Sequence, residues 1–366
     1  MGLTERIEYI NSNAIEMIAS MARVSFREHY VDLYTNQHYT GKFTLDTELD
    51  LWSQEVHRSL PEDIRELLDK FFHSETAFGA SVMVHTLWLD ISSASDFIEK
   101  IKKISPHELM HYFILIGLGP DTEQKSWDAT QRIVERICAD EKEALVFITK
   151  HTFFSPEQKA NLLDMFMDVN KTKDDLMYHF DWYYENVFSH LEQTYMDENK
   201  EQLEKLKRII EREGDDYFKK LGFILFMEKA SKIYLGVSKS LGLSLTNAVF
   251  LDKGCQLYIL GYDHMMILFH KIDPKVKVMD FFKCFTDEQT VEIYKMIKQG
   301  RRSIQSLIRE TGHGANKIND HLHALAKAEL IDIDLENGDV VAFPLDVNLE
   351  EKTMASLKRL MKVPSV

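Results

Sequence analysis

Hydrophobic residues in the first 220 positions recur mostly at the three- and four-residue spacing of α-helices. The clearest example is Glu62–Phe72, whose apolar residues share one helical face behind Pro61. The same pattern predicts helices over residues 13–22, 157–169, 172–195 and 198–214, with further helix starts at Ser95 and Ser105. We therefore expect a helical N-terminal domain over residues 1–220.

The pattern changes after about Asp215, where short apolar runs are separated by glycines. Such runs are typical of strands joined by turns. They comprise Phe223–Phe226, Ile233–Leu235, Ala248–Leu251, Leu257–Leu260 and Met265–Phe269. The sequence therefore predicts a short β-rich connector over residues 221–273, just before Pro274.

The segment from Asp280 to Leu345 combines helical spacing with a terminal hairpin. An apolar-striped helix is followed by a Gly-Arg-Arg turn, a short helix and a longer helix over Ala315–Lys327. Two short strands then flank an Asn-Gly pair, which is a strong hairpin signal. This order predicts a winged helix-turn-helix over residues 274–348, with Ala315–Lys327 as the recognition helix. Residues 349–366 should form a last amphipathic helix, either for dimerisation or for packing on the domain.

Composition and charge narrow the class of protein. The chain is 45% hydrophobic and 28% charged and has no apolar run long enough for a transmembrane helix, so we expect a folded, mainly α protein with a small β component. Three widely spaced cysteines and an N-terminus without a signal-peptide pattern lead us to expect a cytoplasmic location. The net charge of −15 argues against broad nucleic-acid affinity. Even residues 280–345 carry eight Lys and Arg against eleven Asp and Glu, a net charge of −3, so DNA binding there must depend on locally placed cations.

The C-terminal segment resembles the ArsR family of bacterial winged-helix repressors. The matching motifs are Phe281–Phe285 with Thr286-Asp287-Glu288, Ser303–Leu307, His321–Leu325 and Glu329–Ile331. The N-terminal segment is similar to the extra domain of longer ArsR-type regulators from Gram-positive bacteria. The residues that carry this likeness are Trp52, Leu60–Asp63, Phe71-Phe72 and Ser105–Leu109. The resemblance implies a transcription regulator, a repressor that binds double-stranded operator DNA as a homodimer with one recognition helix in each major groove.

Candidate DNA contacts lie at the start of the predicted recognition helix. Asn316 and Asn319 can pair with adenine edges, and Lys317 can reach guanine or phosphate. Asp320 departs from the family pattern. A carboxylate at this position repels phosphate, although it can accept a hydrogen bond from a cytosine amino group. His321 follows at the next turn of the helix.

Further candidate contacts flank that helix in sequence. Arg301 and Arg302, with Ser303 at the start of the short helix, either touch phosphate or form a solvated turn. Asn337 lies at the wing tip, where we expect it mainly to form the hairpin turn and only secondarily to contact the DNA backbone. Asp320 and the acidic balance leave a second possibility open, a winged helix repurposed for protein contact.

Zinc chemistry is the third possibility. His107, Glu108 and His111 match the H-E-x-x-H motif, in which two histidines on one helix face hold Zn²⁺ and the glutamate acts as base. However, Ser105 and Pro106 place His107 in the first turn of a helix, and no third ligand stands out. The metal sites that ArsR proteins use are also missing, since the predicted second helix has no cysteine and the predicted C-terminal helix has no histidine. We therefore predict no cofactor and no enzymatic activity.

An aromatic segment, Tyr178–Tyr184 with Phe188 and Tyr195, has two readings. Aromatic residues at helical spacing usually pack in a core, but they can also line a ligand pocket. If the N-terminal domain senses a small-molecule effector, we expect the site near these residues. The same domain can instead mediate dimerisation.

Overall fold

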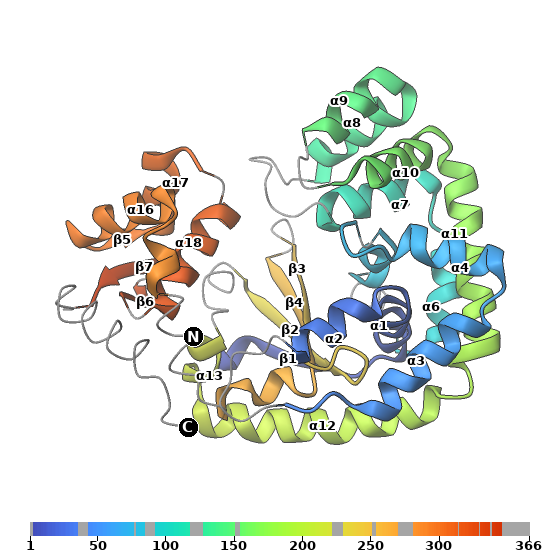
Figure 1. Cartoon of the computed structure of the whole chain (residues 1–366), viewed down its shortest axis with the longest axis horizontal. Helices are drawn as coiled ribbons and strands as arrows, with labels where there is room; N and C mark the ends of the chain where they lie inside the picture. The colour runs from blue at the N-terminus through green and yellow to red at the C-terminus, as the bar shows by residue number, and fades with distance from the viewer. Residues whose placement is uncertain are drawn as a thin grey trace, which may run out of the picture.

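The computed structural model describes residues 3–35, 43–76, 78–84, 92–117, 127–150, 154–221, 230–250, 254–269, 281–313, 315–328, 330–336 and 339–345. Within these ranges the chain is mainly helical with two small β-sheets, which confirms the predicted fold class (Figure 1).

The N-terminal helices are α1 (Asn13–Ser25), α2 (Arg27–Thr35), α3 (Thr47–Ser59), α4 (Glu62–Phe71), α6 (Ala94–Ile101), α7 (Pro106–Tyr112), α8 (Trp127–Ala139), α9 (Glu141–Thr149), α10 (Pro156–Met167), α11 (Val169–Tyr183), α12 (Glu192–Glu213) and α13 (Asp216–Leu221). Shorter helical segments are η1 (Thr4–Arg6), η2 (Phe78–Val84), η3 (Phe113–Gly117) and η4 (Tyr184–Phe188). The helix predicted over residues 172–195 is instead two helices, because the π-helical segment η4 separates α11 from α12.

Local capping signals set several of these helix starts. The hydroxyls of Ser105 and Ser155 each accept a backbone N–H from the first turn of α7 and α10, and a proline follows each serine. These two starts agree with the prediction. At α1 the capping residue is Ser12, whose hydroxyl accepts the N–H of Ile15.

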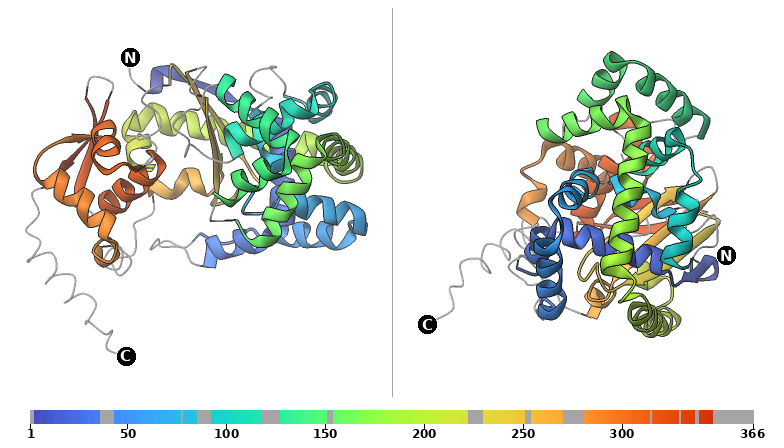
Figure 2. Two further views of the ribbon diagram at one scale, coloured as in Figure 1. Left: turned by 90° about the horizontal axis from the view of Figure 1, so that it is seen from above. Right: turned by 90° about the vertical axis from the view of Figure 1, so that its right-hand side faces the viewer.

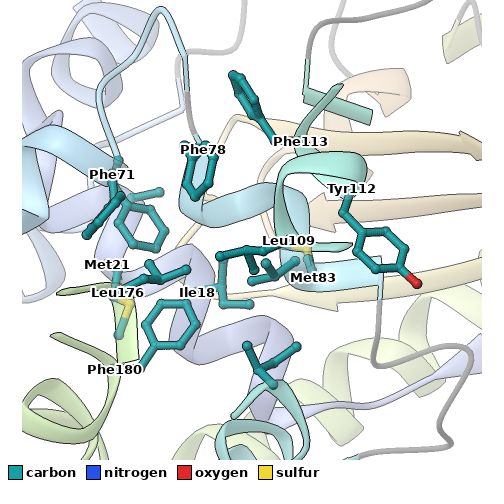
Figure 3. Packing of buried hydrophobic residues seen from close by; sticks show 14 of the residues in the cluster. Ile18, Met21, Phe71, Phe78, Met83, Leu109, Tyr112, Phe113, Leu176 and Phe180 are labelled. Atoms are coloured by element: carbon teal, nitrogen blue, oxygen red, sulfur yellow. The ribbon is translucent and has the colours of Figure 1, made fainter. Parts of the chain in front are cut away.

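The N-terminal helices enclose a core of aliphatic and aromatic side chains. Ile18 and Met21 of α1, Phe71 of α4, and Leu176 and Phe180 of α11 lie close together in it (Figure 3). All five are fully buried. Each buried side chain of this size favours folding by roughly 1.5–3 kcal/mol, so the shared core holds helices from distant parts of the sequence together.

The predicted connector does not form a unit of its own. Its strands β2 (Lys232–Ser238), β3 (Leu245–Phe250) and β4 (Cys255–Gly261) share a sheet with β1 (Ile7–Ile10), in the order β1-β2-β4-β3. β1, β2 and β4 run parallel, and β3 is antiparallel to β4. The proposed boundary at residue 220 therefore does not separate helices from strands. The apolar run Met265–Phe269 is also not a strand, since it lies in the 3-10 helix η6 (His264–Phe269).

The sheet separates two hydrophobic cores. On β4, Leu257 and Ile259 belong to the core of the N-terminal helices, whereas Tyr258 and Leu260 belong to a second core. This alternation is the two-residue period of a strand. The second core also contains residues of α12, of α13 and of the C-terminal segment. β4 is buried on both faces, as expected for a central parallel strand.

A close backbone contact fixes the end of β4. A Cβ atom on Gly261 would lie 2.0 Å from the carbonyl oxygen of Gly242, so no other residue fits there. Gly242 has a φ of 53°, a conformation that favours glycine. Its carbonyl accepts the N–H groups of Asp263 and His264, which ties the turn after β2 to the turn after β4.

The C-terminal segment has the predicted order of elements. These are α16 (Glu288–Lys298), β5 (Arg302–Ser303), α17 (Ile304–Thr311), α18 (Ala315–Lys327), β6 (Ile331–Glu336) and β7 (Asp339–Pro344). The strands form a sheet in the order β5-β7-β6, and Figure 1 and the left view of Figure 2 show the segment as a lobe at one end of the molecule. Three helices followed by a hairpin that pairs with a short strand are the arrangement of a winged helix-turn-helix. The helix predicted over residues 349–366 lies outside the described residues.

Candidate nucleic-acid interface

Helix α18 presents one face to the domain core and another to solvent. Ile318, Leu322 and Leu325 are buried at the spacing of a helical stripe. Lys317 and Asp320 are exposed, three residues apart, and therefore share the outer face near the start of the helix. Among the described side chains near the start of α18, the outer face thus carries one cation and one anion, so their charges balance.

Local interactions fix both ends of helix α17. The hydroxyl of Ser303 accepts the backbone N–H of Ser306 and caps the helix. Gly312 ends the helix in the left-handed conformation, with a φ of 70°. Leu307 is fully buried and holds α17 on the domain. Because the Ser303 hydroxyl accepts a backbone N–H of α17, the observed role of Ser303 is to begin this helix.

The two arginines before α17 differ in their surroundings. Arg301 is exposed. Arg302 is half-buried in β5, its Nη1 donates to the Arg301 carbonyl at 3.3 Å, and its Nε lies 3.8 Å from a carboxylate oxygen of Glu310. Arg302 is therefore partly committed to the domain, whereas Arg301 lies on its surface.

His321 does not lie on the outer face of α18. Its side chain is buried, and its Nδ1 is 2.8 Å from the Thr290 hydroxyl and 3.2 Å from Asp287 on the capping turn of α16. The sequence predicts His321 as a DNA contact. The structure instead places its side chain against α16, where it joins α18 to α16.

The proton positions in this contact follow from the donors available. The Thr290 hydroxyl lies 2.7 Å from Asp287, which can only accept, so Thr290 donates to Asp287 and receives the Nδ1 proton of His321. Burial lowers the pKa of His321, and the nearby Lys317 lowers it further, against the opposing effect of Asp287. The hydrogen bond from Thr290 lowers the pKa of Asp287. The contact therefore joins a neutral histidine to an ionised carboxylate at neutral pH.

The remaining predicted contacts are three asparagines. Asn316 and Asn319 belong to α18, but their side chains lie outside the described part of the structure. Asn337 also lies outside it. The wing itself is present, since β6 and β7 pair as far as Glu336 opposite Asp339.

The zinc motif takes up a different geometry from a metal site. His107 is exposed, whereas His111 is buried beside the ring of Tyr112, and Glu108 accepts a hydrogen bond from the Tyr112 hydroxyl. In the residues that the structure describes, no three His, Cys, Asp or Glu side chains gather as metal ligands. The geometry gives no support to the metallopeptidase alternative.

The aromatic segment lies mostly in the core. Phe180, Tyr183, Phe188 and Tyr195 are buried with the N-terminal helices, whereas Tyr178 is half-exposed. This packing favours the core reading of these residues. The polar groups beside them were not predicted, and they form the buried cluster around α1 that is described below.

Comparison of the chain with protein-family models, with curated proteins and with solved structures finds no match in any of the three. Among the helices that the structure describes, none combines the length and apolarity that crossing a bilayer requires. The relation to the ArsR family therefore stays a prediction based on its motifs and on the order of elements.

Proposed function

We propose that this protein is a cytoplasmic DNA-binding transcription regulator that acts through its C-terminal winged helix. The observation that carries the proposal is the exposed start of α18, with Lys317 outward, on a helix held by a buried stripe and by His321. A helix mounted in this way can enter a major groove while the β6–β7 hairpin rests on the backbone. The protein acts as a repressor and binds a roughly palindromic operator as a homodimer.

The N-terminal part supplies the regulatory signal in this proposal. The second hydrophobic core contains Leu206 and Ile210 of α12 together with Ile293 and Leu322 of the winged helix. A change in the position of α12 can therefore be passed to the winged helix through packed side chains. This route does not require a direct contact between a ligand and DNA.

The test is fluorescence anisotropy of the full-length protein with duplex DNA from upstream of its own gene, at two salt concentrations and with random DNA as competitor. Specific binding should survive the competitor and weaken as salt rises. Lys317→Ala should weaken binding and, if Lys317 contacts a phosphate, lower the slope against log salt by about 1. Lys295→Ala is the matched control, because Lys295 is an exposed lysine on α16 and its loss changes net charge equally.

Asp320 favours a second candidate function, a winged helix that contacts protein. Its exposed carboxylate lies on the same face as Lys317 and would repel phosphate. Asp320→Asn separates the two candidates. If α18 lies on DNA, removing the negative charge should strengthen binding at low salt. If Asp320→Asn and Lys317→Ala both leave DNA affinity unchanged, the assignment of α18 as the DNA-reading helix is wrong.

A further inference from the structure

Arg23 of α1 is a buried cation that uses only part of its guanidinium group. Its side chain is 1% exposed, Nη1 donates to the Ser240 carbonyl at 3.0 Å, and the group lies 4.9 Å from the centre of the Tyr30 ring. Nε has no hydrogen-bond partner among the described residues. Within the same ranges, no carboxylate forms an ion pair with Arg23, and its side-chain hydrogen bond is the one from Nη1. A buried N–H edge without a hydrogen-bond acceptor is costly, so this edge is unusual.

The nearest candidate counter-ion on the same helix is already fully used. Glu16 lies two turns before Arg23, and its carboxylate accepts from Asn199 Nδ2, from the N–H of Lys239, and from both the N–H and the hydroxyl of Ser240. These distances run from 2.7 to 3.1 Å. Four donors fill the hydrogen-bonding positions of a carboxylate, so Glu16 is not available to the edge of Arg23.

Another arginine in the same region shows what that edge normally holds. Arg27 of α2 donates from Nε and from Nη2 to the two carboxylate oxygens of Asp50, both at 2.7 Å. This is the side-on bidentate pair that a guanidinium makes with a carboxylate. Arg23 presents the same Nε–Nη2 edge, four residues earlier in sequence, without an acidic side chain of the described residues opposite it.

The position in the fold is one where ligands commonly bind. Ser240, the partner of Arg23, lies two residues after β2 ends, and Asp263, which accepts a hydrogen bond from Tyr34, lies two residues after β4 ends. Both are at the carboxyl ends of parallel strands. Ligands of parallel α/β sheets bind outside these ends.

We propose that the Nε–Nη2 edge of Arg23 binds the carboxylate of a small organic acid at the carboxyl end of the sheet. A monoanion suits the site better than a phosphate dianion, because Glu16 reaches the same Ser240 and already contributes one negative charge. Burial raises the pKa of Tyr30 and of Tyr195, so these neighbouring side chains stay neutral and do not balance Arg23.

Such a ligand would act on the element that leads to the winged helix. Ser240 joins Arg23 to Glu16, and Glu16 in turn holds Asn199 of α12. A carboxylate on Arg23 therefore shifts a network that includes α12. This regulatory role rests on the proposed function above, whereas binding at Arg23 does not.

The first experiment is thermal unfolding of the full-length protein in sodium acetate and in sodium chloride at equal ionic strength, with inorganic phosphate as a third arm. Acetate carries the recognised group alone, and it should raise Tm above the chloride value because it binds the folded state. Arg23→Lys keeps the charge but loses the planar fork, and it should lose the acetate shift. Arg27→Lys is the matched control and should keep it.

Arg23→Met is the second variant, because methionine removes the buried charge and leaves an apolar side chain of similar length. It should also lose the shift, with the fold checked by circular dichroism. An equal acetate shift in the folded Arg23 variants, no shift in the unchanged protein, or an Arg23-dependent shift that is larger with phosphate than with acetate would overturn the proposal. Only the Arg23-dependent part counts, because phosphate also raises Tm by general exclusion from the protein surface.

Anisotropy with the operator DNA separates this proposal from the proposed function. An acetate shift that depends on Arg23 but leaves DNA affinity unchanged supports the binding site and overturns its regulatory role. Specific DNA binding without any acetate shift supports the regulator and overturns the Arg23 site.

Discussion

Glu16 offers the most direct test of the buried cluster, since its carboxylate accepts four hydrogen bonds and its side chain is fully buried. Glu16→Ala removes all four. The Ser240 hydroxyl and the Asn199 amide can turn toward other acceptors, but the backbone N–H groups of Lys239 and Ser240 cannot. Each buried donor left unpaired costs about 1–3 kcal/mol, so the variant should lose at least about 2–6 kcal/mol of stability. That is a large share of the roughly 5–15 kcal/mol that stabilises a typical protein.

The assay is urea unfolding followed by far-UV circular dichroism. Glu16→Gln should lose less than Glu16→Ala, because its amide oxygen can still accept two of the four bonds. Glu201→Ala is the control, since Glu201 is an exposed glutamate of α12 and its loss should leave the midpoint unchanged. A loss below about 1 kcal/mol for Glu16→Ala, with an unchanged slope against urea, would refute the account of Glu16 as the centre of the network.

Two further predictions concern stability. Burial lowers the pKa of His179 to about 3. The unfolded chain therefore takes up the proton first as pH falls below about 6.5, and stability should fall by about 2 kcal/mol between pH 6.5 and pH 5 through this group alone. His179→Phe should flatten that part of the stability–pH curve, and an unchanged curve would contradict the burial argument. Gly261→Ala forces a Cβ to within 2.0 Å of the Gly242 carbonyl and should cost more than about 3 kcal/mol in urea unfolding. At Gly312 an added Cβ would meet no atom within 4 Å, and only the φ of 70° disfavours alanine. Gly312→Ala should therefore lower the free energy of unfolding by only about 1–2 kcal/mol.

Much of the fold follows from local sequence signals. The serine-proline pairs at Ser105 and Ser155 determine two helix starts because capping depends on adjacent residues. The order of the winged helix follows from helical spacing and from its hairpin turn. The pairing of β1 with β2 could not be predicted in this way, because the pattern of Ile7–Ile10 does not identify a partner so distant in the sequence.

The candidate site was predictable only in part. Lys317 and Asp320 lie outward, as helical spacing indicates. His321 falls three residues after Ile318 and four before Leu325, so the same spacing already placed it on the buried stripe. The role of Arg23 had no such signal. A charged residue in the middle of an apolar helix face shows that something unusual is buried, but its surroundings depend on Ser240, which only the folded chain brings near.

The pairing of Ile7 with Ile233 sets an order of events for the newly made chain. Because 226 positions separate the two residues, the first strand emerges from the ribosome long before its neighbour exists. The intervening helices have local contacts and can collapse early, whereas the sheet has a high contact order and closes late. Until β2 is made, β1 exposes an unpaired edge that can join a second chain. Pulse proteolysis of stalled nascent chains should therefore find residues 7–10 protected only once the strands after residue 232 have left the exit tunnel.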